Sequence, residues 1–143
     1  MADHTALLAR LQNWSLASGD FRSDRQLADE VLIADGWRCE PDASFEGGVR
    51  WFIGPYSAAT TSRPHPIKDL NVAIDVVPRC CNWRLTVIGQ KATAHIWTGE
   101  IFRDEFEGRS ERPSVALLIA LFKYVQSATD GIRGQQSDKR ATN

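Results

Sequence analysis

The clearest alternation of apolar and polar residues spans residues 82–97. Gly89 and Gln90 separate two alternating runs, and a two-residue loop with glycine first is typical of a type II′ turn in a β-hairpin. Such a loop sets the register of the strands, and a shift of one residue would exchange their faces. We therefore predict a hairpin here. We also expect helices to pack on it, because an isolated hairpin is only marginally stable in water.

The predicted register gives the hairpin one apolar and one polar face. Its apolar face carries Trp83, Leu85, Val87, Ala92, Ala94 and Ile96. Its polar face places Arg84 opposite His95, with Trp97 farther along the same side. Large residues of the first strand oppose small residues of the second, which leaves room for a helix. We expect the whole apolar face to be core, sealed by the apolar helix that follows Pro113.

Apolar residues at helical spacing predict two helices before the hairpin. In the first, apolar residues recur from Ala6 to Trp14, and Gly19 marks the exit. In the second, Ser23 and Gln26 have the form of a capping box, with Ser23 as the N-cap. Gly36 stands where a left-handed residue ends a helix, and Trp37 after it is placed to pack back onto that helix.

The segment between these helices and the hairpin has a weaker pattern. Residues 37–40 and 49–53 read as short strands, and residues 56–66 as a long surface loop. Residues 67–77 fit a helix bounded by prolines, although their alternation of Val and Ile also fits a strand. We favour the helix.

The end of the chain combines an acidic stretch with an apolar helix. Residues 100–111 hold five acidic residues against two arginines, and the apolar Ile101, Phe102 and Phe106 within them suggest a short edge strand or a packed loop. Residues 115–125 are apolar almost all round, which is typical of a helix buried on more than one side. Residues 127–143 are polar and rich in charge, and we expect a disordered tail there.

The predicted elements indicate a single α+β domain over residues 1–126. It would hold an antiparallel β-sheet of about 4 strands packed with about 4 helices. Helices on both faces would make it an α/β/α sandwich.

Composition limits the functional classes. The 143 residues carry a net charge of −1, so no general field draws the chain to nucleic acid or to an anionic membrane. No apolar run is long enough for a membrane span, and no signal peptide is visible. The three cysteines have no framework spacing, so we expect free thiols in a reducing cytoplasm.

Four patterns stand in a recognisable order: Leu-Ala-Asp…Ala-Asp-Gly-Trp at 27–37, Leu-Asn-Val-Ala-Ile-Asp-Val-Val-Pro at 70–78, Asn-Trp-Arg-Leu at 82–85, and Arg-Pro-Ser-Val-Ala-Leu-Leu at 112–118. Over roughly residues 7–125 the chain resembles the phage "ABA sandwich" type of small protein, found in phages and prophages of bacteria such as the rhizobia. The resemblance implies that fold and a phage or prophage origin. Members of the family mostly lack an assigned activity, and the resemblance transfers no catalytic residue.

No chemical site is indicated. The metal-ligating residue types considered were Cys39, Cys80, Cys81, His65 and His95, and their spacing does not match a zinc site. No phosphate-binding glycine loop occurs, and we predict no cofactor. A Cys81–His95 pair, both flanking the hairpin, is the remote enzymatic alternative. Our main prediction is therefore a protein that is not an enzyme.

Partner binding is the favoured function. The candidate residues are Arg84, His95, Trp97, Glu100, Asp104, Glu105 and Glu107. We predict a phage accessory protein in the cytoplasm of a bacterial host that binds a host or phage protein. In its sharpest form it would inhibit a defence system, as anti-CRISPR proteins do. The alternative is a nucleic-acid-binding module using Arg84, His95 and Trp97. We expect no membrane partner, and self-association stays open.

Overall fold

The computed structural model describes residues 4–17, 20–41, 43–44, 49–53, 57–58, 64–99 and 105–141. In chain order the elements are α1 (Thr5–Gln12), α2 (Phe21–Ala34), β1 (Arg38–Pro41), β2 (Val49–Ile53), β3 (Ser57–Ala58), α3 (Leu70–Val76), β4 (Cys81–Ile88), β5 (Lys91–Thr98), β6 (Phe106–Ser110) and α4 (Pro113–Ala141). The strands form two antiparallel sheets, ordered β1-β2-β3 and β4-β5-β6. The α+β class is confirmed, with the strands divided between two sheets instead of one.

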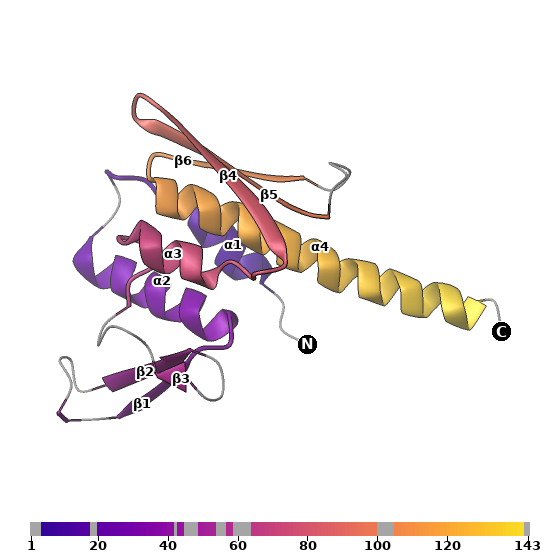
Figure 1. Ribbon diagram of the computed structural model, residues 1–143, viewed down its shortest axis with the longest axis horizontal. Helices are drawn as coiled ribbons and strands as arrows, with labels where there is room; N and C mark the ends of the chain where they lie inside the picture. The colour runs from indigo at the N-terminus through magenta and orange to yellow at the C-terminus, as the bar shows by residue number, and fades with distance from the viewer. Residues whose placement is uncertain are drawn as a thin grey trace.

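Helix α4 lies at the centre of the molecule (Figure 1). The sheet β4-β5-β6 packs on one side of it, and α1 and α3 contact it from the other. Every residue from Ser114 to Phe122 is buried, which confirms the helix predicted to be buried on more than one side. The buried Ser114 hydroxyl donates a hydrogen bond to the carbonyl of Ile67, which ties the first turn of α4 to the segment before α3.

Helix and sheet approach so closely because Gly108 of β6 has no side chain. A Cβ at this position would lie 2.6 Å from the backbone nitrogen of Ala120 and would also overlap the carbonyl oxygen of Ala116. Two alanines of α4 therefore face a glycine, and the two backbones meet almost directly. On β5 the neighbouring Ala94 is fully buried as well.

The hairpin register is confirmed, with Trp83 paired with Ile96 and Arg84 with His95. Gly89 has φ of 62° and no described non-glycine residue has a positive φ, which matches a type II′ turn. The prediction that its whole apolar face is sealed is wrong. Ile96 is buried, but Trp83 is 38% exposed and Val87 55% exposed. Helix α4 lies under β5 and β6 and contacts β4 only sparsely, so β4 extends past it and is left largely uncovered.

The ends of α2 were predicted with mixed success. The N-cap is Asp20, not Ser23: the Asp20 carboxylate accepts hydrogen bonds from both the backbone N–H and the hydroxyl of Ser23. A carboxylate that accepts two hydrogen bonds is a stronger N-cap than the serine hydroxyl. The C-terminal end is confirmed, because Gly36 has φ of 91° and the Trp37 N–H donates to the Leu32 carbonyl.

The remaining segments refine the predicted boundaries. The segment 67–77 is helical, but α3 starts at Leu70 with Asp69 as its N-cap. Most of the predicted loop 56–66 lies outside the described residues, although β3 falls within it. Helix α4 does not end near Gln126 but runs to Ala141. The division into a domain of residues 1–126 and a disordered tail stays a prediction.

Candidate partner-binding surface

Five of the seven candidate residues lie together on the face of β4-β5-β6 that points away from α4. They are Arg84, His95, Trp97, Glu105 and Glu107, contributed by all three strands and by the residue just before β6. The other two, Glu100 and Asp104, lie outside the described residues. We call this face the polar face. In the described part of the chain, the helices lie on the opposite side of this sheet (Figure 1), so it is not the middle layer of a sandwich.

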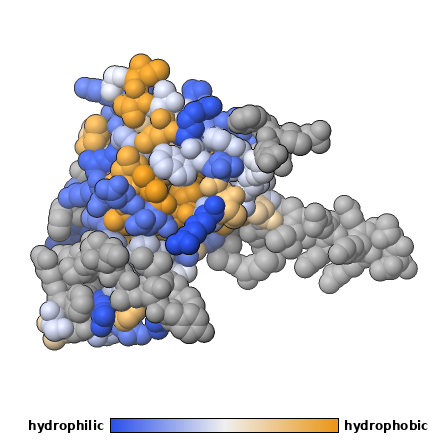
Figure 2. Space-filling model, viewed as in Figure 1, coloured by the Kyte–Doolittle hydropathy of each residue, from blue (hydrophilic) through white to orange (hydrophobic). Residues whose placement is uncertain are grey.

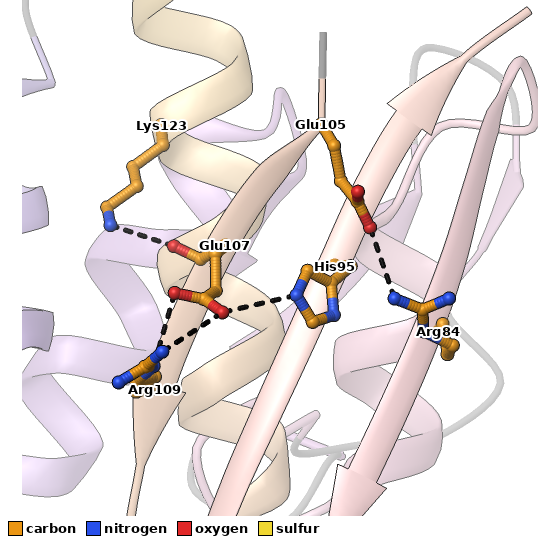
Figure 3. A network of polar contacts seen from close by, with 6 residues as sticks. All are labelled: Arg84, His95, Glu105, Glu107, Arg109 and Lys123. Carbon is orange, nitrogen blue, oxygen red and sulfur yellow. Dashed lines mark hydrogen bonds and ion pairs between the residues drawn. The ribbon is translucent and has the colours of Figure 1, made fainter. Parts of the chain in front are cut away.

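Glu107 is the centre of a network of polar contacts on this face (Figure 3). One of its carboxylate oxygens lies 3.2 Å from Nε2 of His95, and the carboxylate also pairs with the guanidinium of Arg109 at 3.1 Å. The backbone carbonyl of Glu107 accepts a hydrogen bond from Nζ of Lys123, which reaches over from α4. Glu107 therefore links β6 to the neighbouring strand β5 and to helix α4.

A second contact pair lies at the far edge of the same face. Arg84 of β4 donates to Glu105 at 3.3 Å. Its guanidinium also stands 6.0 Å from the centre of the Trp97 ring, within the range of a cation–π contact. Arg84 is thus positioned by an acid on one side and an aromatic ring on the other, even though its side chain is 55% exposed.

Charges on the polar face are balanced. The hydrogen bond and charge of Arg109 lower the pKa of Glu107 below its usual range, and His95 adds to the effect. Glu105 is paired with Arg84 in the same way. The acidic stretch of residues 100–111 therefore presents, in its described part, alternating charges and not a bare negative patch. Paired carboxylates of this kind offer little field to steer a basic partner.

Sequence reasoning missed two members of the network. Arg109 was counted only as one of the two arginines in the acidic stretch of residues 100–111. It stands two residues after Glu107 on β6, and period-two alternation alone places both on the same face. Lys123 carried no local signal, since only the packing of α4 against β6 brings its ammonium group to this edge.

His95 retains one unmet hydrogen-bonding group. Its Nδ1 atom is buried and has no hydrogen-bond partner among the described residues. A buried polar atom left in this way costs roughly 1–3 kcal/mol. The imidazole is therefore held by its Glu107 contact and by packing, at some cost to stability.

A hollow of about 380 Å³ adjoins the polar face at the end of the hairpin. Its lining includes Trp14 just after α1, Lys91 and Thr93 from β5, and Arg109 from β6. The surface next to the network is thus concave and carries two cationic side chains beside an aromatic ring.

The enzymatic alternative is not supported by the geometry. Cys81 lies on the α4 side of the sheet and His95 on the polar face, because their positions on the paired strands differ in alternation. Burial raises the pKa of the Cys81 thiol to about 11, so it is protonated at neutral pH. Within the described ranges, no group of three or more His, Cys, Asp or Glu side chains is arranged to hold a metal ion.

In comparisons with protein-family models, with curated proteins and with solved structures, nothing matches this chain. The resemblance to phage ABA sandwich proteins therefore stays a prediction based on sequence motifs. A search of the described helices for one long and apolar enough to cross a membrane found none.

Proposed function

We propose that this chain is a non-catalytic accessory protein that acts by binding another protein through its polar face. The observation that supports this is the network around Glu107. Side chains from two strands and one helix form this network, and the Arg84–Glu105 pair adds β4 to it, on a sheet face that the described helices leave open. Charged surface residues kept in one arrangement provide a complementary pattern for a partner more than they stabilise the fold.

The composition of the face suits a protein partner. Arginine and aromatic residues are enriched among interface residues that carry binding energy, and Arg84 next to Trp97 provides both. Alternating charges match a protein surface with its own mixture of charges. The charges of a nucleic acid are all phosphate anions, and both Glu105 and Glu107 would oppose them. The nucleic-acid alternative is therefore the weaker one.

The biological setting of the proposal rests on the sequence resemblance alone. It would place the protein in a bacterial host cell carrying a phage or prophage. Binding of a host defence complex, in the manner of an anti-CRISPR protein, is the most specific form of this proposal.

The test is affinity capture from host lysate with the tagged full chain, followed by mass spectrometry. We compare Arg84→Glu with Arg79→Glu, which makes the same charge change at an exposed position in the turn before β4. The introduced carboxylate at position 84 would repel Glu105 and disrupt the face. We expect one partner to be retained by the wild type and Arg79→Glu, and reduced about tenfold or more by Arg84→Glu.

Three results would count against the proposal. They are recovery of no partner, equal capture by both variants, and a salt-dependent gel shift of DNA or RNA that Arg84→Glu abolishes. The last would favour the nucleic-acid alternative.

A further inference from the structure

The two edges of the sheet β4-β5-β6 are protected very differently. Strand β6 has five residues, and Lys123 binds the carbonyl of Glu107 on it. Strand β4 has eight residues, and among the described elements it pairs only with β5. Natural sheets protect edges with lysine, proline, bulges or a covering element. Strand β4 has neither lysine nor proline, its one charged residue is Arg84 on the polar face, and its ladder with β5 continues without a bulge over its whole length.

The hairpin loop determines which backbone groups of β4 point outward. In a two-residue loop the flanking residues, Ile88 and Lys91, form a hydrogen-bonded pair, and such pairs alternate along an antiparallel ladder. The N–H and C=O groups of Trp83, Leu85 and Val87 therefore point away from β5. The N–H of Cys81, in the same alternation, donates to the carbonyl of Pro78 and not to β5.

The side chains of these outward-directed residues are also incompletely covered. Trp83 is 38% exposed and Val87 55% exposed, and Leu85 between them is half-buried. These three residues form an apolar stripe along an unpaired edge, on the α4 side of the sheet. Ile88 at the tip, 77% exposed, lies on the polar face. Figure 2 shows apolar surface gathered over the hairpin. Unpaired backbone and apolar side chains at one edge are the features of a strand that pairs with another strand.

We infer that β4 pairs in antiparallel fashion with β4 of a second copy of this chain. The two copies would be related by a two-fold axis normal to the sheet. Under such an axis, residues that lie opposite each other on the two β4 strands point to the same face of the sheet. Because successive residues of a strand point to opposite faces, one residue must lie opposite its own copy, with the axis between the two copies. The residues near the middle of β4 are Arg84, Leu85 and Thr86.

Comparison of charge and side-chain size in the three registers favours the one in which Leu85 lies opposite its own copy at the axis. An axis at Arg84 would set two guanidinium groups directly opposite each other, which is destabilising. An axis at Thr86 would place Trp83 opposite Gly89 in the turn. With Leu85 on the axis, Trp83 lies opposite Val87 of the second copy, an aromatic and a β-branched residue, which is a favourable cross-strand pair.

The resulting dimer has a continuous six-stranded sheet with both α4 helices on the same side. Its new ladder uses the outward-directed backbone groups, and the apolar stripes of the two copies cover each other on the α4 side. In this register Arg84 faces Thr86 of the second copy, so no like charges meet. The polar face remains open, and the inference is independent of the proposed function.

The first experiment measures mass by sedimentation over roughly 1–100 µM chain, the range in which weak complexes dissociate. We expect a shift from the 16.0 kDa monomer to a species of about twice that mass. Val87→Pro removes an outward N–H without touching the ladder to β5. It should weaken dimerisation about tenfold or more, with unchanged circular dichroism. Ile33→Lys, at a 60% exposed position of α2, is the control for apolar exposure and should leave the dimer intact.

The second experiment tests the register by disulfide cross-linking, in a background with the exposed Cys39 and Cys80 replaced by serine. Leu85→Cys should cross-link two chains on oxidation, because the two copies of this residue meet at the axis within disulfide reach. Arg84→Cys and Thr86→Cys should not. A chain that stays monomeric throughout would overturn the inference, as would a dimer unaffected by Val87→Pro or one cross-linked at position 84 or 86. A monomer that instead takes up another protein on this edge would also overturn it.

Discussion

The two faces of the sheet β4-β5-β6 are built on opposite principles. On the face toward α4, Gly108 lets backbone meet backbone, and Ala92, Ala94 and Ile96 are buried. On the polar face, the contacts are ion pairs between side chains that are mostly half-exposed or exposed, centred on Glu107. Burial of apolar area contributes about 25 cal/mol per Å², whereas a surface ion pair contributes about 0–1 kcal/mol. Stability therefore comes from the α4 face, and the polar face can vary with much less effect on the fold.

The largest loss of stability is expected from Gly108→Ala, on the face of the sheet toward α4. The added methyl group would overlap backbone atoms of Ala116 and Ala120, and α4 would have to move away from the sheet. We expect a loss of about 3 kcal/mol or more in the free energy of unfolding, measured by urea denaturation. Gly89→Ala is the matched control. Its Cβ meets nothing within 4 Å, so only the positive φ opposes it, at about 1–2 kcal/mol. Equal losses for the two variants would show that the close approach at Gly108 does not exist.

The second prediction uses two residues paired across the hairpin, Ile96 and Trp83. Tryptophan is the larger residue, but Ile96 is fully buried under α4, whereas Trp83 lies beyond the edge of α4 and is 38% exposed. We expect Ile96→Ala to cost about 2–5 kcal/mol. Trp83→Ala should cost less, about 1–2 kcal/mol, since much of its surface is already in water. Both are measured by thermal and urea unfolding at concentrations low enough for the monomer. A larger loss for Trp83→Ala would mean that β4 is covered as the sequence pattern predicted.

The smallest effect is expected on the polar face, from Glu107→Gln. The pKa of Glu107 in the folded protein is lowered from 4.5, so its ionised form stabilises the fold above that pH. This contribution is lost as the pH falls through the lowered pKa. The variant should therefore be slightly less stable than the wild type near neutral pH, and the two should converge in acid. Urea midpoints measured from about pH 7 down to about pH 3 test this. A difference that grows in acid would contradict the assigned role of Glu107.

Local sequence patterns were sufficient to predict much of the fold. Glycine in the hairpin loop and the alternation on either side were sufficient for the register, because turn type and strand alternation depend on neighbours in the chain. The same is true of the end of α2 at Gly36 and of the buried helix after Pro113. Helix starts were less accurate. Asp20 caps α2 three residues before the predicted cap Ser23, and Asp69 caps α3, so that this helix starts at Leu70 and not at the predicted residue 67.

The candidate site could also be predicted only in part from local sequence patterns. Arg84 and His95 were placed together by the register, but the pairing of Glu105 and Glu107 with arginines depended on where β6 docks. The stretch that holds both acids is separated from Arg84 by the whole of β5. Its side chains could be read as a negative patch until the third strand was in place.

By itself, the sequence determined which residues of the hairpin share a face, since alternation is a property of any strand. Which half of the apolar face becomes core was decided only by the tertiary structure. Helix α4 is drawn beneath β5 and β6 by the small residues Ala94 and Gly108, and the larger residues of β4 are left overhanging it. A pattern of apolar residues shows that a surface can be buried. The position of the element packed against it decides how much of that surface is buried, and leaves Trp83 and Val87 at an open edge.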